Sequence, residues 1–415
     1  MSCYTLIHNG RLINGTGSAA IADGAVLIHN NQIQAAGAKA DLVLPGSEIT
    51  MIDAGGGTIL PGFIDCHVHL SLEGANLNEI MLKPFSLNFF EMIDRMRRTV
   101  EAGITTVRDA GGTDLGVKTA VERGHVLGPR MQLSITMLSI TGGHGDGWMP
   151  SGMEVTLFPA YPGMPRNICD SIGGVRQKVR EVLRAGAEVV KLCSTGGAVS
   201  PTDHPMYVQF SLGELKAAVE EAQARNGARV MAHAIAADGI KNAIRAGIHS
   251  IEHGIFMDDE AIEMMVANGT FLVPTLSAIV IGLEHAAKHN TLPQYAIDKA
   301  KGALDLQREN TRKAIAAGVK MAMGTDAGVF PHGLNLRELQ LMTELGMSPM
   351  DAIVATTKTA AECLGWEDQI GTLEMGKLAD VVITSVDPLS NIGGLKEAAN
   401  IKLVMKDGAV VKDIR

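Results

Sequence analysis

The sequence predicts an α/β protein: a closed (β/α)8 barrel, the TIM barrel, joined to a small β-sandwich formed by the N- and C-terminal segments. Three observations carry this prediction. A helix-like amphipathic run, a glycine and a short apolar run recur through the middle of the chain. Eight apolar runs of this kind can be counted, which is the number of strands in a closed barrel. The two ends instead contain short strands with Asn-Gly and Asp-Gly turn signals.

The glycine in each repeat suits the left-handed backbone conformation just past a helix C-terminus. These glycines are Gly103, Gly186, Gly227, Gly247, Gly269 and Gly318. The apolar runs are continuous rather than alternating, as expected for parallel strands buried on both faces. The predicted strands lie at 58–70, 105–110, 131–136, 188–194, 228–234, 250–254, 270–275 and 320–327. An open doubly wound sheet would show the same alternation, but no G-x-G-x-x-G motif follows the first strand.

The two ends are each too small to form a stable core alone. We therefore expect residues 1–57 and 366–415 to pair into one discontinuous β-sandwich domain, and residues 58–365 to form the barrel domain.

The composition favours a small-molecule partner. The 415 residues include 36 Lys and Arg against 45 Asp and Glu, a net charge of −9. Without a basic cluster, neither nucleic acid nor an anionic membrane is the expected partner. Five cysteines are too few for a disulfide framework, and neither a signal peptide nor about 18 consecutive apolar residues is found. A cytoplasmic location is therefore expected.

Polar residues stand at the ends of the predicted strands, and in a parallel barrel these ends meet on one face. His67 and His69 are two residues apart, so their side chains point the same way. Four further residues end other strands: Lys191, His233, His253 and Asp326. Imidazoles with a carboxylate are ligands suited to zinc and similar divalent ions, so we expect a metal site. Taken alone, a histidine on an apolar strand, such as His233 or His253, is more often a hydrogen-bonded core residue than a ligand. For Asp326 the alternative is a helix cap.

These residues, in GFIDCHVHL, VVKLCSTGG, VMAHA, SIEHG and MGTDAG, resemble the binuclear-metal amidohydrolase superfamily over essentially the whole chain. The resemblance implies that His67, His69 and Asp326 hold one metal ion. It implies that His233 and His253 hold a second, with Lys191 carboxylated by CO₂ as the bridge. Two divalent ions per subunit, with zinc as the expected metal, would share a bridging hydroxide. Asp326 would act as general base and then as general acid, and a homo-oligomer is expected.

Loop residues narrow the resemblance to Xaa-Pro dipeptidases (prolidases) and related dipeptidases and N-acyl amino acid hydrolases. His144, in GGHGD, would polarise the substrate carbonyl, and Tyr207 would hold the substrate carboxylate. Arg108 is a further carboxylate candidate, although pairing with Asp109 is its simpler role. His332 lies near the barrel mouth and could touch substrate. The expected reaction is therefore hydrolysis of the amide bond of Xaa-Pro or Xaa-hydrophobic dipeptides or of N-acyl amino acids.

Three alternatives stay open at this point. The first is an amidase acting on an aroyl-amino acid, such as a mycotoxin amide of phenylalanine. The second is a cyclic-amidine hydrolase or deaminase of the imidazolone type, which Lys191 disfavours because such enzymes usually lack the bridging lysine. The third is a non-catalytic relative, which the complete set of metal ligands disfavours.

Overall fold

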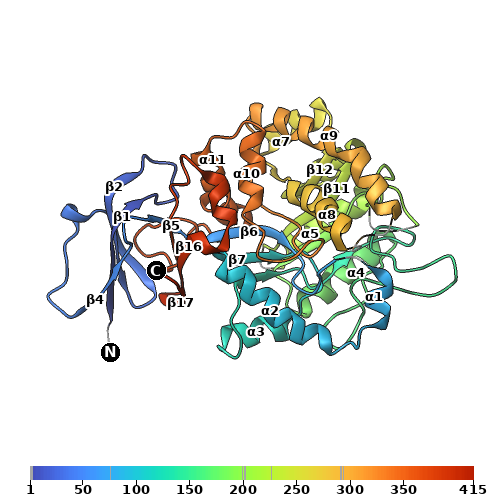
Figure 1. Ribbon diagram of the computed structural model, residues 1–415. Coiled ribbons are helices and arrows are strands. Elements are labelled where there is room, and N and C mark those ends of the chain that lie inside the picture. Colours follow the sequence, from blue (N-terminus) through green and yellow to red (C-terminus); the bar gives the residue numbers. More distant parts are fainter. Residues whose placement is uncertain are drawn as a thin grey trace.

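The computed structural model describes residues 3–74, 76–198, 200, 202–225, 227–289, 292 and 294–415. It contains the two predicted parts, a β-sandwich and a parallel β/α barrel. In Figure 1 the sandwich lies at the left, where blue and red strands meet, and the barrel with its helices fills the right. Strands from both ends of the described chain therefore build the sandwich.

The sandwich strands follow the order β17-β16-β15-β5-β1-β2-β3, and β4 pairs with β1. The two ends of the chain meet where β5 and β15 pair antiparallel. Apolar residues from both ends share one core, which includes Ile7, Val26, Ile59, Val381 and Leu403. The bounds are β1 Tyr4–Leu12, β2 Ile21–His29, β3 Gln32–Ala38, β4 Ile49–Asp53, β5 Thr58–Pro61, β15 Val381–Thr384, β16 Ile401–Lys406 and β17 Ala409–Asp413.

The chain passes from the sandwich to the barrel at Gly62. The predicted first barrel strand, 58–70, is wrong in its first four residues, because β5 belongs to the sandwich and β6 (Phe63–Val68) begins the barrel. A Cβ atom on Gly62 would lie 2.2 Å from Thr105 Oγ1 and 2.9 Å from Asp380 Cβ. Only glycine fits this close crossing without a shift of its neighbours. The domain boundary at residues 365 and 366 remains a prediction.

Eight parallel strand positions form the barrel. Their bounds are β6 Phe63–Val68, β7 Ile104–Asp109, β8 Arg130–Leu133 with β9 Met137–Leu138, β10 Val189–Cys193, β11 Arg229–Ala236, β12 Ser250–Phe256, β13 Phe271–Val273 and β14 Lys320–Met321. Short β8 and β9 together occupy the third position, since β8 pairs with β7 and β9 with β10. The barrel closes between β6 and the segment after β14. Cys66 N donates to Met323 O at 2.9 Å, and His69 N donates to Ala327 O at 2.8 Å.

Helices surround these strands (Figure 1). They are α1 Leu77–Leu82, α2 Leu87–Glu101, α3 Leu115–Glu122, α4 Ser171–Arg184, α5 Leu212–Gln223, α6 Ala237–Arg245, α7 Asp259–Asn268, α8 Leu276–His289, α9 Gln294–Ala316, α10 Arg337–Glu344, α11 Pro349–Ala355 and α12 Lys358–Leu364. All six predicted glycine positions adopt positive φ, from 65° at Gly269 to 105° at Gly186. The predicted helix stops are thereby confirmed. Within the described ranges, no helix combines the length and the hydropathy that crossing a membrane requires.

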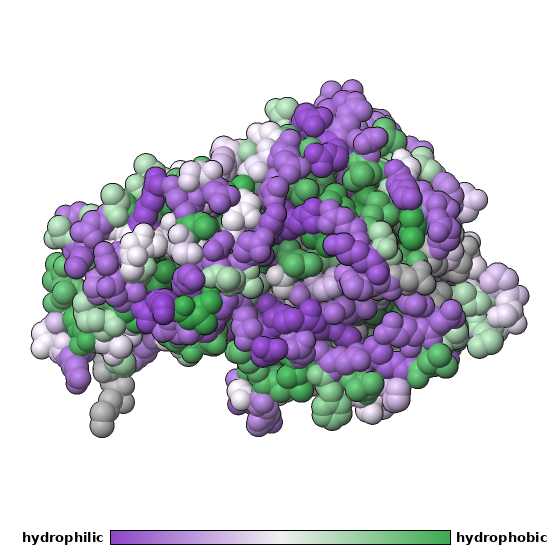
Figure 2. Space-filling view, in the orientation of Figure 1, coloured by the Kyte–Doolittle hydropathy of each residue, from purple (hydrophilic) through white to green (hydrophobic). Residues whose placement is uncertain are grey.

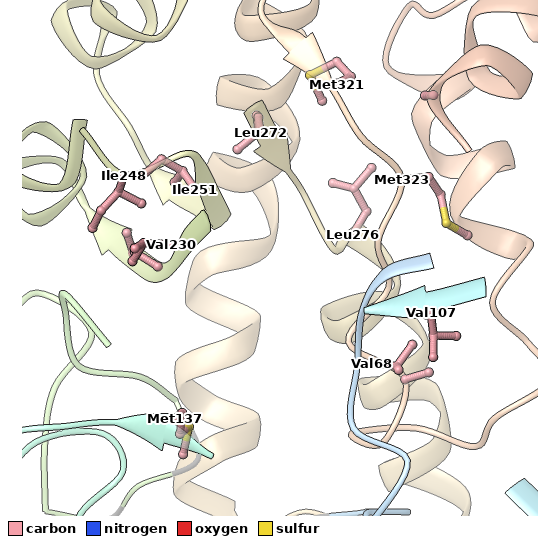
Figure 3. Close-up of a cluster of buried hydrophobic side chains, with 14 of the residues drawn as sticks. Val68, Val107, Met137, Val230, Ile248, Ile251, Leu272, Leu276, Met321 and Met323 are labelled. Atoms are coloured by element: carbon pink, nitrogen blue, oxygen red, sulfur yellow. The ribbon is translucent and has the colours of Figure 1, made fainter. Parts of the chain in front are cut away.

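The barrel core is continuous from strand to strand. Figure 3 shows Val68, Val107, Val230, Ile251 and Leu272, contributed by β6, β7, β11, β12 and β13, as members of one buried cluster. These residues are no more than 3% exposed. Burial of this kind holds the strands in a fixed arrangement, so the groups at the strand ends are positioned by rigid elements.

Candidate active site

The C-terminal ends of the barrel strands open into a cavity with a volume of about 140 Å³. All six residues predicted at the strand ends line it: His67, His69, Lys191, His233, His253 and Asp326. They come from β6 and the residue just after it, from β10, β11 and β12, and from the segment after β14. His144 joins them from the loop after β9. The structure therefore brings together side chains that are up to about 260 residues apart in the sequence.

The donor atoms of His67, His253 and Asp326 lie within 4.8 Å of one another, so these side chains converge on a space where metal ions could bind. Asp326 Oδ1 lies 3.5 Å from His67 Nε2 and 3.4 Å from His69 Nε2. Lys191 Nζ lies 3.4 Å from His67 Nε2. Nitrogen and carboxylate donors in this arrangement fit a divalent ion.

Acceptors on the protein set the orientation of the imidazoles. His67 Nδ1 donates to Glu252 Oε2 at 2.6 Å, and His69 Nδ1 donates to the Gly111 carbonyl at 2.9 Å. Both Nε2 atoms are thereby left unprotonated toward Asp326. His253 Nδ1 contacts Thr275 Oγ1 at 2.7 Å.

His233 is held the opposite way round. Its Nε2 donates to the Gly196 carbonyl at 3.0 Å, which leaves Nδ1 as the free ring nitrogen. Each of the four imidazoles therefore has one nitrogen engaged with the protein and one available as a ligand.

Burial controls the charge of the cluster. It lowers the pKa of His67 and of His253 well below the usual value, with neighbouring cationic groups adding to the effect. Burial also lowers the pKa of Lys191, and it raises the pKa of Asp326 to about 6. Neutral imidazoles are the form that binds metal ions.

Two residues of the cluster adopt a backbone conformation that is rare outside glycine. His253 has φ 71° and Asp326 has φ 61°. Left-handed residues of this kind store strain and concentrate at functional sites, where the surrounding structure holds them in place. The strand ends therefore turn both side chains into the cavity at an energetic cost.

Sequence reasoning missed two buried carboxylates that support the cluster. Glu252, which is not exposed, accepts hydrogen bonds from His67 Nδ1, from Arg108 Nη2 at 2.9 Å and from Ser250 Oγ at 2.7 Å. Asp65 accepts from Thr325 Oγ1 at 2.6 Å and joins β6 to the segment that carries Asp326. An acidic residue inside an otherwise apolar strand, as in GFIDC and SIEHG, was the available signal.

The prediction that Arg108 binds the substrate carboxylate is wrong in this structure, and so is its pairing with Asp109. Arg108 is 1% exposed and donates to Glu252 and to the Cys66 carbonyl. Asp109 instead accepts from Thr113 Oγ1 and Leu70 N. The alternation of side chains along β7 directs Arg108 into the barrel interior, away from the cavity.

Two other predicted substrate contacts lie outside the cavity. His332 is 2% exposed, and its Nε2 donates a hydrogen bond to the His69 carbonyl at 3.2 Å. It therefore stabilises the backbone just after β6. Tyr207 is 62% exposed and its ring packs beside His204. Neither residue belongs to the cavity lining. The role of Tyr207 in carboxylate binding stays a prediction.

His144 does line the cavity. Its ring stacks on His233 with 4.4 Å between centroids, and its Nδ1 lies 3.7 Å from Asp203 Oδ2. Burial lowers the pKa of His144, while the carboxylate of Asp203 opposes this shift. A ring held this way can present one nitrogen to a substrate carbonyl.

Comparison with known proteins agrees with this geometry. The model of the Amidohydrolase family matches residues 58–411. Ochratoxinase of Aspergillus niger is 33% identical over 422 residues, which cover 98% of this chain and 86% of that protein. A crystal structure of a Xaa-Pro dipeptidase with bound methionine in the active site has a TM-score of 0.90 and 33% identity, covering 99% of this chain and all of that one. Imidazolonepropionase of Idiomarina loihiensis is 25% identical over 412 residues, covering 91% and 90% of the two chains.

A barrel with convergent imidazoles and a carboxylate at its strand ends defines a hydrolase with a candidate metal site. The chain belongs to the amidohydrolase family. The predicted class of enzyme and the predicted resemblance are therefore confirmed.

Proposed function

We propose that this enzyme is a metal-dependent hydrolase that cleaves the amide bond of dipeptides, Xaa-Pro or Xaa-hydrophobic, or of N-acyl amino acids. The observation that carries the proposal is the convergence of four imidazoles, Lys191 and Asp326 on one cavity. The similarity to a Xaa-Pro dipeptidase over nearly the full length of both chains supports the substrate class.

We assign His67, His69 and Asp326 to one divalent ion and His233 and His253 to a second. Carboxylated Lys191 would lie between them, since an unmodified ammonium beside two dications would be repelled. Its Nζ is already 3.4 Å from His67 Nε2. Zinc suits these donors, and manganese, cobalt or iron would accept them too.

Bound divalent ions would supply Lewis-acid polarisation of the scissile carbonyl and a lowered pKa for the attacking water. The chain's own groups then move the protons. Asp326 takes a proton as the water oxygen bonds to the carbonyl carbon. His144 donates a hydrogen bond to the carbonyl oxygen. As the C–N bond breaks, Asp326 returns the proton to the leaving nitrogen. The products are a carboxylic acid and an amine, and transfer of the acid's proton to the amine gives a carboxylate and an ammonium group.

Metal analysis and a substrate panel test this proposal together. Protein grown with added bicarbonate is assayed for metal per subunit. The same sample is then tested on Xaa-Pro, Xaa-Phe, Xaa-Arg and N-acyl amino acids. Near two metal ions with cleavage of one series supports the proposal. One ion or none, without cleavage, contradicts it.

A second candidate function is amidase activity on an aroyl-amino acid such as a mycotoxin amide of phenylalanine. The identity to ochratoxinase is 33%, the same as the identity to the Xaa-Pro dipeptidase structure. The two relatives therefore support the amidase function and the dipeptidase function equally. N-aroyl-phenylalanine in the same panel separates the two. The imidazolone-type alternative is weaker than these two. Lys191 lines the cavity, and enzymes of the imidazolone type usually lack the bridging lysine. Homo-oligomer assembly and a cytoplasmic location remain predictions.

A further inference from the structure

The start of α8 forms part of the cavity wall. Thr275 comes directly before the helix, and it lines the cavity together with Ala278 and Ile279 of the first turn. Figure 2 shows hydrophobic residues in a recess in the right half of the molecule, where Figure 1 draws α8 and β12, with hydrophilic residues around it. The Thr275 hydroxyl contacts His253 Nδ1 at 2.7 Å. The placement of the helix start therefore bears on the orientation of this imidazole.

A buried carboxylate from another helix holds this start in place. Glu338 lies in the first turn of α10 and is not exposed to solvent. Its Oε1 accepts a hydrogen bond from Leu276 N at 2.8 Å, and its Oε2 accepts one from Ser277 N at 2.7 Å. The first N–H groups of a helix have no acceptor within the helix, and a negative charge beside them is favourable. Glu338 therefore caps α8 from outside.

This external cap changes what Thr275 can do. A threonine directly before a helix usually accepts a hydrogen bond from the N–H of the second or third helical residue. Here both groups have other acceptors, because Ser277 N donates to Glu338 and Ala278 N donates to the Thr275 carbonyl at 3.1 Å. The hydroxyl is thereby left for His253.

The backbone and the packing fix the same arrangement. Thr275 has φ 47°, a left-handed conformation that a β-branched residue adopts only when its surroundings impose it. Leu276 is 2% exposed and belongs to the buried cluster of Figure 3, and Leu339 and Met342 of α10 belong to the same cluster. The starts of α8 and α10 are therefore held together by apolar contacts as well as by Glu338.

We propose that Glu338 is a positioning residue for the metal centre, which caps α8 so that the Thr275 hydroxyl is free to hold the ring of His253. Glu338 lies outside the cavity lining, so it acts through Thr275. With Nδ1 held in this way, Nε2 is the ring nitrogen left for a metal ion. The inference rests on the proposed function, because that function makes His253 a metal ligand.

Zinc affinity tests the role of Glu338 without catalysis. Burial, and more weakly the nearby Asp65, raises the pKa of Glu338 to about 7, so competition with a chelating dye is measured at pH 8. In Glu338→Gln an N–H group replaces one acceptor oxygen, and one backbone N–H of α8 loses its acceptor. We expect the Thr275 hydroxyl to turn toward the helix and the zinc affinity to fall about 10- to 100-fold.

Three variants serve as comparisons. Thr275→Val lacks the hydroxyl and should lose a similar factor in zinc affinity, whereas Thr275→Ser keeps the hydroxyl and should bind zinc like the wild type. Asp114→Asn is the matched control, because Asp114 caps α3 by accepting from Val117 N at 3.0 Å, and no described residue of α3 lines the cavity. Its zinc affinity should equal that of the wild type.

The double variant Glu338→Gln/Thr275→Val separates positioning from general destabilisation. If Glu338 acts through the hydroxyl, its substitution should lower the zinc affinity of Thr275→Val by less than about twofold, because the shared contact is already lost. Losses that multiply in the double variant overturn the inference. Wild-type zinc affinity in Glu338→Gln overturns it too.

Crystal structures of the metal-free proteins give a readout that needs neither metal nor activity. The distance from Thr275 Oγ1 to His253 Nδ1 should stay near 2.7 Å in the wild type and exceed about 3.5 Å in Glu338→Gln. A retained hydrogen bond in the variant overturns the inference. If Glu338→Gln does not fold, Glu338→Asp replaces it, because its carboxylate is one methylene too short to reach both N–H groups. A wild-type protein that binds no zinc or cleaves no amide would refute the proposed function, and this distance would still decide the inference.

Discussion

Glu252 offers the sharpest test of how the barrel interior supports the site. Its two oxygens accept from His67 Nδ1, Arg108 Nη2 and Ser250 Oγ, and the side chain is not exposed to solvent. Glutamine has nearly the same shape but one acceptor oxygen and one donor nitrogen. In Glu252→Gln, at least one of the three donors therefore faces an N–H group.

The magnitude follows from which donor loses its acceptor. If the amide nitrogen faces His67, the imidazole must move its proton to Nε2, the atom that points toward Asp326. Loss of such a supporting acceptor lowers metal affinity by about 10- to 100-fold. If the nitrogen faces Arg108 instead, one guanidinium N–H group lacks an acceptor. In either orientation the buried Arg108 loses its counter-ion, at a cost of about 3–5 kcal/mol.

Two assays and one control measure these effects. Urea unfolding of the metal-free protein gives the stability, and competition with a chelating dye gives the zinc affinity. Glu284→Gln is the matched control, because Glu284 also pairs with an arginine, Arg337, but its side chain is 49% exposed. We expect the control to cost less than about 1 kcal/mol. A Glu252→Gln protein with the stability of the control and unchanged zinc affinity would refute the reasoning.

Three further predictions concern catalysis, metal content and acid stability. Asp326→Asn should retain most of its metal but lose about 10²- to 10⁴-fold in kcat, because the proton acceptor is gone; near-normal turnover would remove Asp326 from this role. Lys191→Met should bind close to one metal ion per subunit or fewer by elemental analysis, even with bicarbonate, whereas retention of two ions would exclude the lysine bridge. Burial, with Arg229 and other cations nearby, lowers the pKa of His249 from 6.5 to about 3. The folded state therefore binds fewer protons than the unfolded state, and stability is lost as the pH falls from 6.5 toward 3. Relative to the wild type, His249→Gln should gain about 2 kcal/mol of unfolding free energy between pH 7.5 and pH 5; a constant difference would contradict this.

Much of the barrel could be predicted because its signals are local. Glycine just past a helix end needs only the backbone conformation of one residue, and all six such glycines have positive φ. A continuous apolar run indicates a buried strand by itself. The gathering of His67, His233 and Asp326 follows from parallel topology alone, since every strand delivers its C-terminal end to the same face.

The remaining features depend on contacts across the barrel. Glu252 on β12 reaches His67 on β6, which is not a neighbouring strand, and this pairing depends on how the strands are staggered around the circle. The same stagger decides that Arg108 points inward. Loop residues such as Tyr207 depend on the path of a long connection, which sequence periodicity does not describe. The left-handed conformations of His253 and Asp326 are likewise imposed by the packed surroundings.

The pairing of β5 with β15 also bears on how the protein is made. Pro61 and Val381 are partners in this ladder although about 320 residues separate them in the chain. During synthesis the early strands β1 to β5 are therefore complete long before β15 to β17 leave the ribosome. Until then one side of β5 presents unpaired backbone groups, which invite pairing with other chains. Chaperone demand during translation should accordingly be greatest for this sheet, and a variant with its last three strands removed should aggregate even though every barrel strand is present.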